Sequence, residues 1–250
     1  MINEIIEGIK DLKGYTIGDE NITCVCYADD AALVAEDEDS LQRLLYRFSL
    51  LATKFDLTLS TKKTKTLTIS KEPLRCKLQL YDKVIEQVMS FTYLGIQITS
   101  HQDLETEVKT QSIKALRISG CLNNAVWSNK FLKTEAKVRI YKTMIRPILT
   151  YAAETRPDTS KTRQMLETAE MKTLRRILGV SLFDKQRSED IREKCEIQKI
   201  DDWVKCRREN WYAHVERMSE DRILKKILMN KPAGKRSRGR PKKRWQDELG

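Results

Sequence analysis

The sequence predicts an α+β fold in which a β-hairpin, a helix and short antiparallel strands come first and an all-helical region follows. Apolar residues occur in short strand-like runs up to about residue 100 and then at helical spacing up to about residue 230; the remainder is rich in Gly, Pro, Lys and Arg. We therefore expect three regions, 1–100, 101–230 and 231–250. The last region should lack fixed structure because it has little apolar surface to bury.

Composition limits the class of protein before any motif is considered. The chain has 250 residues, 40% of them hydrophobic, with only 5 prolines and 9 glycines, which is enough to bury a sizeable core. The acidic residues within Met1 to Lys10 fit an amphipathic helix and argue against a signal peptide. No run of about eighteen apolar residues occurs, so we expect no membrane-spanning helix.

The six cysteines are irregularly spaced, and we expect reduced thiols in an intracellular protein. Cys206 and His214 have the spacing of part of a zinc knuckle, but Glu209 stands where a second Cys would be needed. A four-ligand zinc site is therefore not expected.

The first hundred residues alternate between β-like and helical patterns. Two apolar or β-branched runs, Asn21 to Tyr27 and Ala31 to Ala35, flank Ala28, Asp29 and Asp30, which predicts a hairpin with acids at its turn. Apolar residues at helical spacing from Leu41 to Phe55 predict an amphipathic helix, capped by Asp39 or Ser40. Residues 57–99 then predict short antiparallel strands.

Beyond His101 the pattern is helical. We expect helices over 104–122, over 138–145 with a stop at Pro147, and from about Ser160 to a stop at Gly179. Further helices are predicted over 188–195, 200–215 and 219–228.

Asp29 and Asp30 are the candidate metal ligands. Adjacent carboxylates on a tight hairpin repel each other, and Mg²⁺ or Mn²⁺ relieves that repulsion and prefers such hard oxygen donors. The alternative is an ordinary polar turn. A second pair, Asp201 and Asp202, has no such setting, so the dipeptide alone carries little weight.

An ordered series of motifs resembles reverse transcriptases of the non-LTR retrotransposon (LINE) type. Tyr27-Ala28-Asp29-Asp30 between two hydrophobic strands resembles the polymerase palm motif, Phe55 to Lys65 looks like the next palm motif, and Phe91-Thr92-Tyr93-Leu94-Gly95-Ile96 is similar to the strand leading into the thumb. Later segments that resemble these proteins are 141–155, 170–180, 214–218 and 239–245.

The resemblance implies a partial palm followed by a helical thumb-like and carboxyl-terminal region. It implies RNA-directed DNA polymerase activity in the parent protein, with an RNA template and a DNA primer or target as partners and two divalent ions binding the dNTP phosphates and the primer 3′ hydroxyl. Asp29 and Asp30 would be catalytic metal ligands, and Lys63 would lie near the triphosphate. Lys63 could equally be a solvated lysine of a basic turn, since Lys62 and Lys65 flank it.

Several departures lead us to expect an incomplete catalyst. The palm of this family uses another metal-binding Asp on an upstream strand, which would lie before Met1. Asp56 replaces the usual Gly, Ser60 replaces the usual Asn, and Arg156 stands where a Trp is common. A noncatalytic nucleic-acid-binding remnant that uses the helical region and the tail is the alternative, and a decayed copy without a selected role is a third possibility.

The basic tail is the second candidate site. The formal net charge is +11, and residues 231–244 hold eight cations and no acid. The cations expected to contact nucleic acid are Lys235, Arg236, Arg238, Arg240, Lys242, Lys243 and Arg244. Arg238-Gly239-Arg240-Pro241 is similar to an AT-hook core, which binds the minor groove of A·T-rich DNA. The alternative is a general phosphate-binding or nuclear-import cluster, and we expect a nuclear location.

Overall fold

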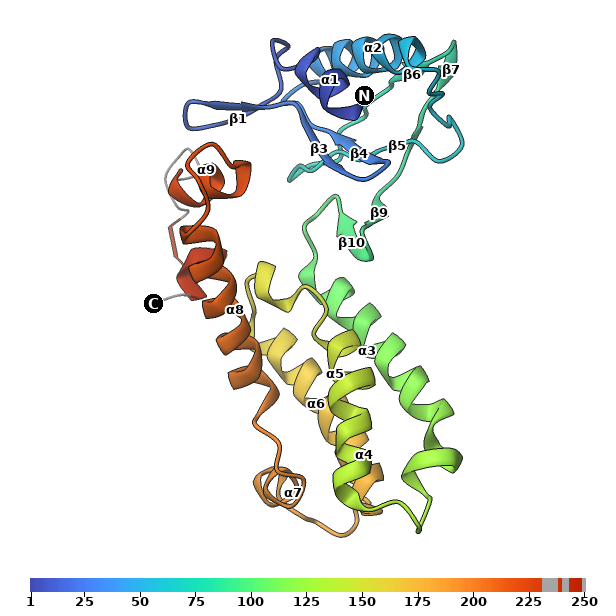
Figure 1. Ribbon diagram of the computed structural model, residues 1–250, viewed down its shortest axis with the longest axis vertical. Helices are drawn as coiled ribbons and strands as arrows, with labels where there is room; N and C mark the ends of the chain where they lie inside the picture. The colour runs from blue at the N-terminus through green and yellow to red at the C-terminus, as the bar shows by residue number, and fades with distance from the viewer. Residues whose placement is uncertain (231–237, 240–242, 249–250) are drawn as a thin grey trace. The chain divides into compact units, whose positions relative to one another are not determined.

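The computed structural model describes residues 1–230, 238–239 and 243–248 (Figure 1). Its contacts divide the described chain into two compact units. The first contains residues 1–102 and 218–230, and the second contains residues 103–217 and the described part of 238–248. The predicted α+β class is confirmed by helices and short strand pairs, whereas the predicted boundaries between palm, thumb and tail remain a prediction. No helix in the described residues is long and apolar enough to cross a bilayer.

In the first unit, each sheet of the described chain has two strands. The antiparallel pairs are β1 (Tyr15–Ile17) with β2 (Glu20–Ile22), β3 (Cys24–Tyr27) with β4 (Asp30–Leu33), β6 (Gln79–Leu80) with β7 (Lys83–Val84), and β9 (Ser90–Tyr93) with β10 (Ile96–Thr99). The remaining pair, β5 (Lys65–Thr66) with β8 (Glu86–Gln87), is parallel, which corrects the expectation of antiparallel strands throughout. The β6–β7 hairpin between them turns the chain back, so that β8 runs in the direction of β5.

The helices of the first unit cover the hairpin that carries Asp29 and Asp30. They are α1 (Ile2–Glu7), α2 (Glu38–Lys54) and α9 (Ile223–Met229). Leu44 and Phe48 of α2 pack with Ile5 of α1 and Cys24 of β3 in one apolar cluster. The predicted caps of α2 are wrong: Asp37 is the N-cap, and its carboxylate accepts the Ser40 N–H at 2.8 Å.

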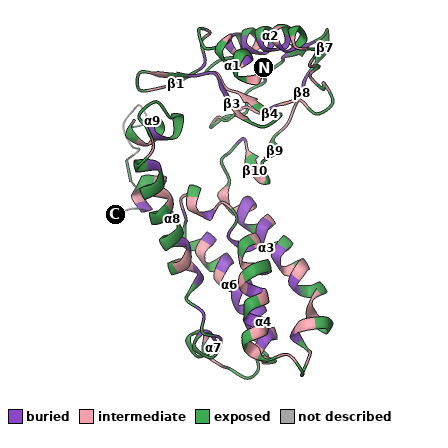
Figure 2. Cartoon of the chain, viewed as in Figure 1, coloured by how far each residue is buried: buried purple, intermediate pink, exposed green. Residues whose placement is uncertain are grey.

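The second unit is helical (Figure 1). Its helices are α3 (Leu104–Cys121), α4 (Thr134–Ile140), α5 (Arg146–Leu149), α6 (Ser160–Leu178), α7 (Ser188–Lys194) and α8 (Ile200–Glu216), with π-turns η1 (Asn123–Trp127) and η2 (Tyr141–Ile145) and 3₁₀ turns η3 (Ala153–Thr155) and η4 (Trp245–Glu248). The buried side chains of α3, α4 and α6 face one another and form the core (Figure 2). The predicted end of α6 is confirmed, with Gly179 at φ 67°.

Two expectations about helix ends are wrong for physical reasons. Pro147 does not stop a helix; it lies in the first turn of α5, where a residue without an N–H costs nothing, and the π-turn η2 precedes it. The region 231–250 does not lack structure throughout, because Trp245–Glu248 form a 3₁₀ turn and Glu248 is buried. Residues 231–237, 240–242 and 249–250 lie outside the described residues.

Candidate functional site

The β3–β4 hairpin positions the two candidate carboxylates at its turn. Tyr27 pairs with Asp30 at the end of the antiparallel register, so Ala28 and Asp29 form the two-residue turn between the strands. Ala28 has a φ of 53°, the left-handed conformation that such tight turns require. Asp29 and Asp30 are both exposed, as is the Tyr27 ring at 67%. The predicted hairpin with acids at its turn is therefore confirmed.

The donor set of this turn suits a hard divalent cation, but only in part. Mg²⁺ and Mn²⁺ favour carboxylate oxygens, and Asp29 and Asp30 supply two such groups next to each other on an exposed turn. Within the described ranges, no group of three or more His, Cys, Asp or Glu side chains is arranged to hold a metal ion. The hairpin can thus provide part of a ligand shell, and the other ligands would come from substrate, water or other protein groups.

A second sequence motif lies beside the hairpin. Tyr93, at the end of β9, donates its hydroxyl to the Val25 carbonyl of β3 at 3.4 Å. Loss of water around this hydroxyl, together with the nearby Cys26 thiol and Asp30 carboxylate, raises the pKa of Tyr93. The structure thus brings together the segments 27–30 and 91–96, which the resemblance treated as separate motifs. No sequence signal identified the contact between Tyr93 and β3.

Two thiols lie on one face of the same strand. Cys24 and Cys26 are two positions apart in β3, so their side chains point the same way, and their Sγ atoms are 3.2 Å apart. Burial, and then the adjacent Cys26 thiol, raise the pKa of Cys24 above its ordinary value. All six cysteines are free, as the sequence predicted.

Lys63 is not brought to the carboxylates. It is exposed in the turn after Leu59, where its backbone N–H donates to the Ser60 carbonyl at 3.1 Å. Its ammonium forms no ion pair with any residue in the part of the chain that the structure describes. Its predicted role near a triphosphate stays a prediction.

The basic tail is described at three of its seven predicted contact residues. Arg238 is exposed, Arg244 is half-buried, and Lys243 donates to the Glu248 carboxylate at 2.5 Å. Lys243 therefore has a partner within the chain that would compete with phosphate. Lys235, Arg236, Arg240 and Lys242 lie outside the described residues.

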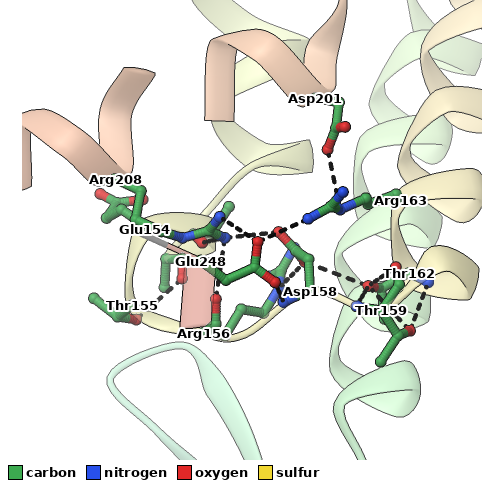
Figure 3. A network of polar contacts seen from close by, with 12 residues as sticks. Glu154, Thr155, Arg156, Asp158, Thr159, Thr162, Arg163, Asp201, Arg208 and Glu248 are labelled. Carbon is green, nitrogen blue, oxygen red and sulfur yellow. Dashed lines mark hydrogen bonds and ion pairs between the residues drawn. The ribbon is translucent and has the colours of Figure 1, made fainter. Parts of the chain in front are cut away.

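A buried polar network holds the end of this tail against the second unit (Figure 3). Glu248, whose side chain is 3% exposed, accepts hydrogen bonds from Arg163 at 2.7 Å and from Arg208 at 3.3 Å. Arg208 also donates to the Asp158 carboxylate at 2.8 Å. The Trp245 indole N–H donates to the Glu154 carbonyl at 2.6 Å. These contacts span about forty to ninety positions of sequence, which is why no local pattern predicted them.

A cavity of about 220 Å³ next to this network does not suit an anion. The described residues that line it are Arg163, Asp201, Asp202, Lys205, Arg208, Lys243, Asp247 and Glu248. Cations and carboxylates are equally numerous in this set, so their fields largely cancel. We interpret the network as structural.

Comparison with known proteins agrees with the hairpin geometry. Residues 1–98 match the family described as reverse transcriptase (RNA-dependent DNA polymerase). A transposon-derived protein of Caenorhabditis elegans is 24% identical over 248 residues, which cover 93% of this chain and 86% of that protein. The matched range includes the hairpin, Lys63 and Tyr93. Residues 1–98 therefore belong to the reverse transcriptase family, and the chain is a reverse-transcriptase-like protein related to those of retrotransposons.

Proposed function

We propose that this chain is part of an RNA-directed DNA polymerase of a non-LTR retrotransposon. The observation that carries the proposal is the exposed Asp29-Asp30 turn between paired strands, with Tyr93 of the next motif hydrogen-bonded to the same hairpin. Such polymerases act on nucleic acids, and their domain family generally uses divalent metals.

In this proposal, Asp29 and Asp30 hold Mg²⁺ or Mn²⁺ by their carboxylate oxygens. Two such ions, when bound, neutralise the charge that develops on the transferred phosphate and on the attacking and leaving oxygens. Lys63 approaches the triphosphate from its exposed turn when substrate binds. Tyr93 supports the hairpin through Val25 rather than contacting substrate, because its hydroxyl is engaged with that backbone carbonyl.

We further propose that the 250-residue chain does not extend a primer by itself. Two-ion catalysis needs ligands on more than one strand, whereas the described residues offer only the adjacent pair at this turn. A single carboxylate pair would bind the ions too weakly and with too little geometric control.

Primer extension on an RNA template in Mg²⁺ tests this proposal, with the purified chain beside Asp29→Ala and with Asp201→Ala as a matched control. We expect no extension by any of the three. Extension that is lost only in Asp29→Ala would support the role of Asp29 and contradict the incompleteness. Extension that survives in Asp29→Ala would contradict the assignment of the hairpin itself.

A second candidate function is noncatalytic binding of nucleic acid, favoured by the cation-rich segment 231–244. Cations that neutralise phosphates release counterions, so affinity should fall steeply with salt. Replacing Lys235, Arg236, Arg238, Arg240 and Lys242 by Ala in the full chain should flatten the plot of log K against log[salt] by up to about 0.9 per lost duplex contact. An unchanged slope would contradict binding by the tail. The same segment supports a nuclear location, which a fluorescent fusion of the two chains would test.

A further inference from the structure

One end of the helical second unit is formed by segments that are far apart in the sequence. Near the carboxyl end of α3, the Ser119 carbonyl accepts the indole N–H of Trp127 at 2.7 Å, and the Ser119 hydroxyl accepts from Arg176 of α6 at 3.4 Å. Lys137 of α4 donates to the Trp127 carbonyl at 2.7 Å. The carboxyl ends of α3 and α6 and the beginning of α4 therefore meet here, at the lower end of this unit in Figure 1.

Two loops leave this end, and each carries a phenylalanine in solvent. Residues 128–133 lead into α4 and residues 179–187 lead from α6 to α7. Phe131 is 97% exposed and Phe183 is 93% exposed, and both loops are coloured as exposed in Figure 2. Trp127, a few residues earlier in the chain, is only 2% exposed. The apolar core at this end is thus complete without either ring, and neither phenylalanine contributes to its packing.

Each phenylalanine is held outward by the same local device. The Phe131 N–H donates to the Asn129 side-chain oxygen at 2.8 Å, and the Phe183 N–H donates to the Ser181 hydroxyl at 3.2 Å. Asp184 in turn accepts the Ser181 N–H at 2.6 Å. These turns order the backbone in advance, which lowers the entropy that a ligand would have to offset on binding.

Cations are interleaved with the two rings. Lys130, Lys133, Lys185 and Arg187 are exposed and form no ion pair with any described residue. The acid within these loops, Asp184, is engaged by Ser181. Glu135 and Glu189 lie in the first turns of α4 and α7, where they interact favourably with the helix amides. The loops themselves therefore carry a net positive charge.

We propose that this end of the helical unit, defined by Phe131, Phe183 and the four loop cations, binds single-stranded nucleic acid. An exposed aromatic ring can stack on any unpaired base, and cations beside it can follow the phosphates. The centre of a protein–protein interface is instead depleted of lysine, which argues against a protein partner. This proposal gives a partner and residues to the second candidate function and is independent of the Asp29-Asp30 turn.

The test measures binding of a fluorescein-labelled twelve-nucleotide oligothymidylate by anisotropy. The background is the full chain with the five tail cations Lys235, Arg236, Arg238, Arg240 and Lys242 replaced by Ala, so that tail binding does not mask the loops. Phe131→Ala and Phe183→Ala should each weaken binding by about fivefold or more, the usual effect of removing a stacking aromatic. All of these side chains are exposed, so folding should be unaffected.

Matched variants separate stacking from general hydrophobicity. Leu182 is 75% exposed in the same loop as Phe183, so Leu182→Ala removes similar apolar surface without a π-face and should leave affinity unchanged. Phe183→Trp should retain binding, and Phe183→Leu should not. Equal losses in Leu182→Ala and Phe183→Ala, or affinity that no Phe variant changes, would overturn the proposal. A change in sedimentation with no change in oligonucleotide affinity would assign the surface to self-association instead.

Discussion

At the scale of single residues, Arg208 is the side chain whose removal we expect to cost most. It is 3% exposed and donates to Asp158, to Glu248 and to the carbonyls of Ala153 and Arg156. Arg208→Met would leave the two carboxylates buried without this partner. Breaking a buried pair in this way typically costs about 3–5 kcal/mol.

Arg207 provides the matched control for Arg208. Its side chain is 52% exposed and pairs with Glu154 at 3.2 Å, so Arg207→Ala should change stability by at most about 1 kcal/mol. Urea denaturation followed by tryptophan fluorescence measures both variants, because all four tryptophans lie in the second unit. Equal losses for the two arginines would contradict the structural role of the network.

Glu170 gives a pH dependence with a defined direction. Its carboxylate is fully buried, and this loss of water raises its pKa above the ordinary value, although Arg192 at 3.2 Å and the Tyr141 hydroxyl at 3.1 Å oppose the rise. The folded state therefore holds the proton more tightly than the unfolded state. The stabilisation from this carboxyl is fully present below its unfolded pKa and is lost as the pH rises through its folded pKa.

Comparison with Glu170→Gln isolates that contribution, because all other titrating groups are common to both proteins. We expect the free energy of unfolding of the wild type, minus that of the variant, to decrease between about pH 4 and pH 7. Urea denaturation at several pH values measures this difference. A difference that grows with pH would mean that Arg192 outweighs burial.

At the scale of elements, two glycines should respond to alanine in opposite ways. Neither has an atom within 4 Å of the place that a Cβ would occupy, so only backbone conformation differs between them. Gly120 lies within α3, and Gly120→Ala should stabilise by about 0.5–1 kcal/mol. Gly179 ends α6 at φ 67°, and Gly179→Ala should destabilise by about 1–2 kcal/mol. Thermal unfolding of the two variants tests this, and shifts of the same sign would contradict the assignment of Gly179 as the cap.

Elements set by local chemistry were predictable from the sequence, and those set by distant contacts were not. The hairpin at Asp29, the amphipathic helix α2 and the end of α6 each follow from apolar periodicity and a turn or cap residue within a few positions. The 3₁₀ turn at Trp245 depends instead on Glu154 and Arg208, so composition wrongly suggested no structure there. Pro147 was misjudged because a π-turn places it at the start of a helix.

The same distinction applies to the candidate site. Asp29 and Asp30 could be identified because the strands on either side have a recognisable pattern and the residues form a familiar motif. The contact between Tyr93 and Val25, and the meeting of the Phe131 and Phe183 loops at one end of the helical unit, require a three-dimensional structure. Exposure of an aromatic side chain is likewise a property of the packed core rather than of the residues next to it.

At the scale of the whole molecule, a metal-binding half-site and nucleic-acid-binding surfaces occur on one chain. The hairpin belongs to the first unit, whereas the Phe131 and Phe183 loops belong to the second. Loss of one should therefore leave the other intact. This separability lets the polymerase assignment and the binding assignment fail independently.

Mn²⁺ binding followed by electron paramagnetic resonance tests the central claim most directly, because it reports the metal itself without requiring catalysis. We predict weak binding by the chain, with a Kd on the order of 1 mM as expected for few carboxylate ligands. Binding should be lost in the variant with Asp29→Ala and Asp30→Ala and retained when Asp201 and Asp202 are replaced instead. Equal binding by wild type and the Asp29/Asp30 variant, or loss only with Asp201 and Asp202, would contradict the assignment of the hairpin as the metal site.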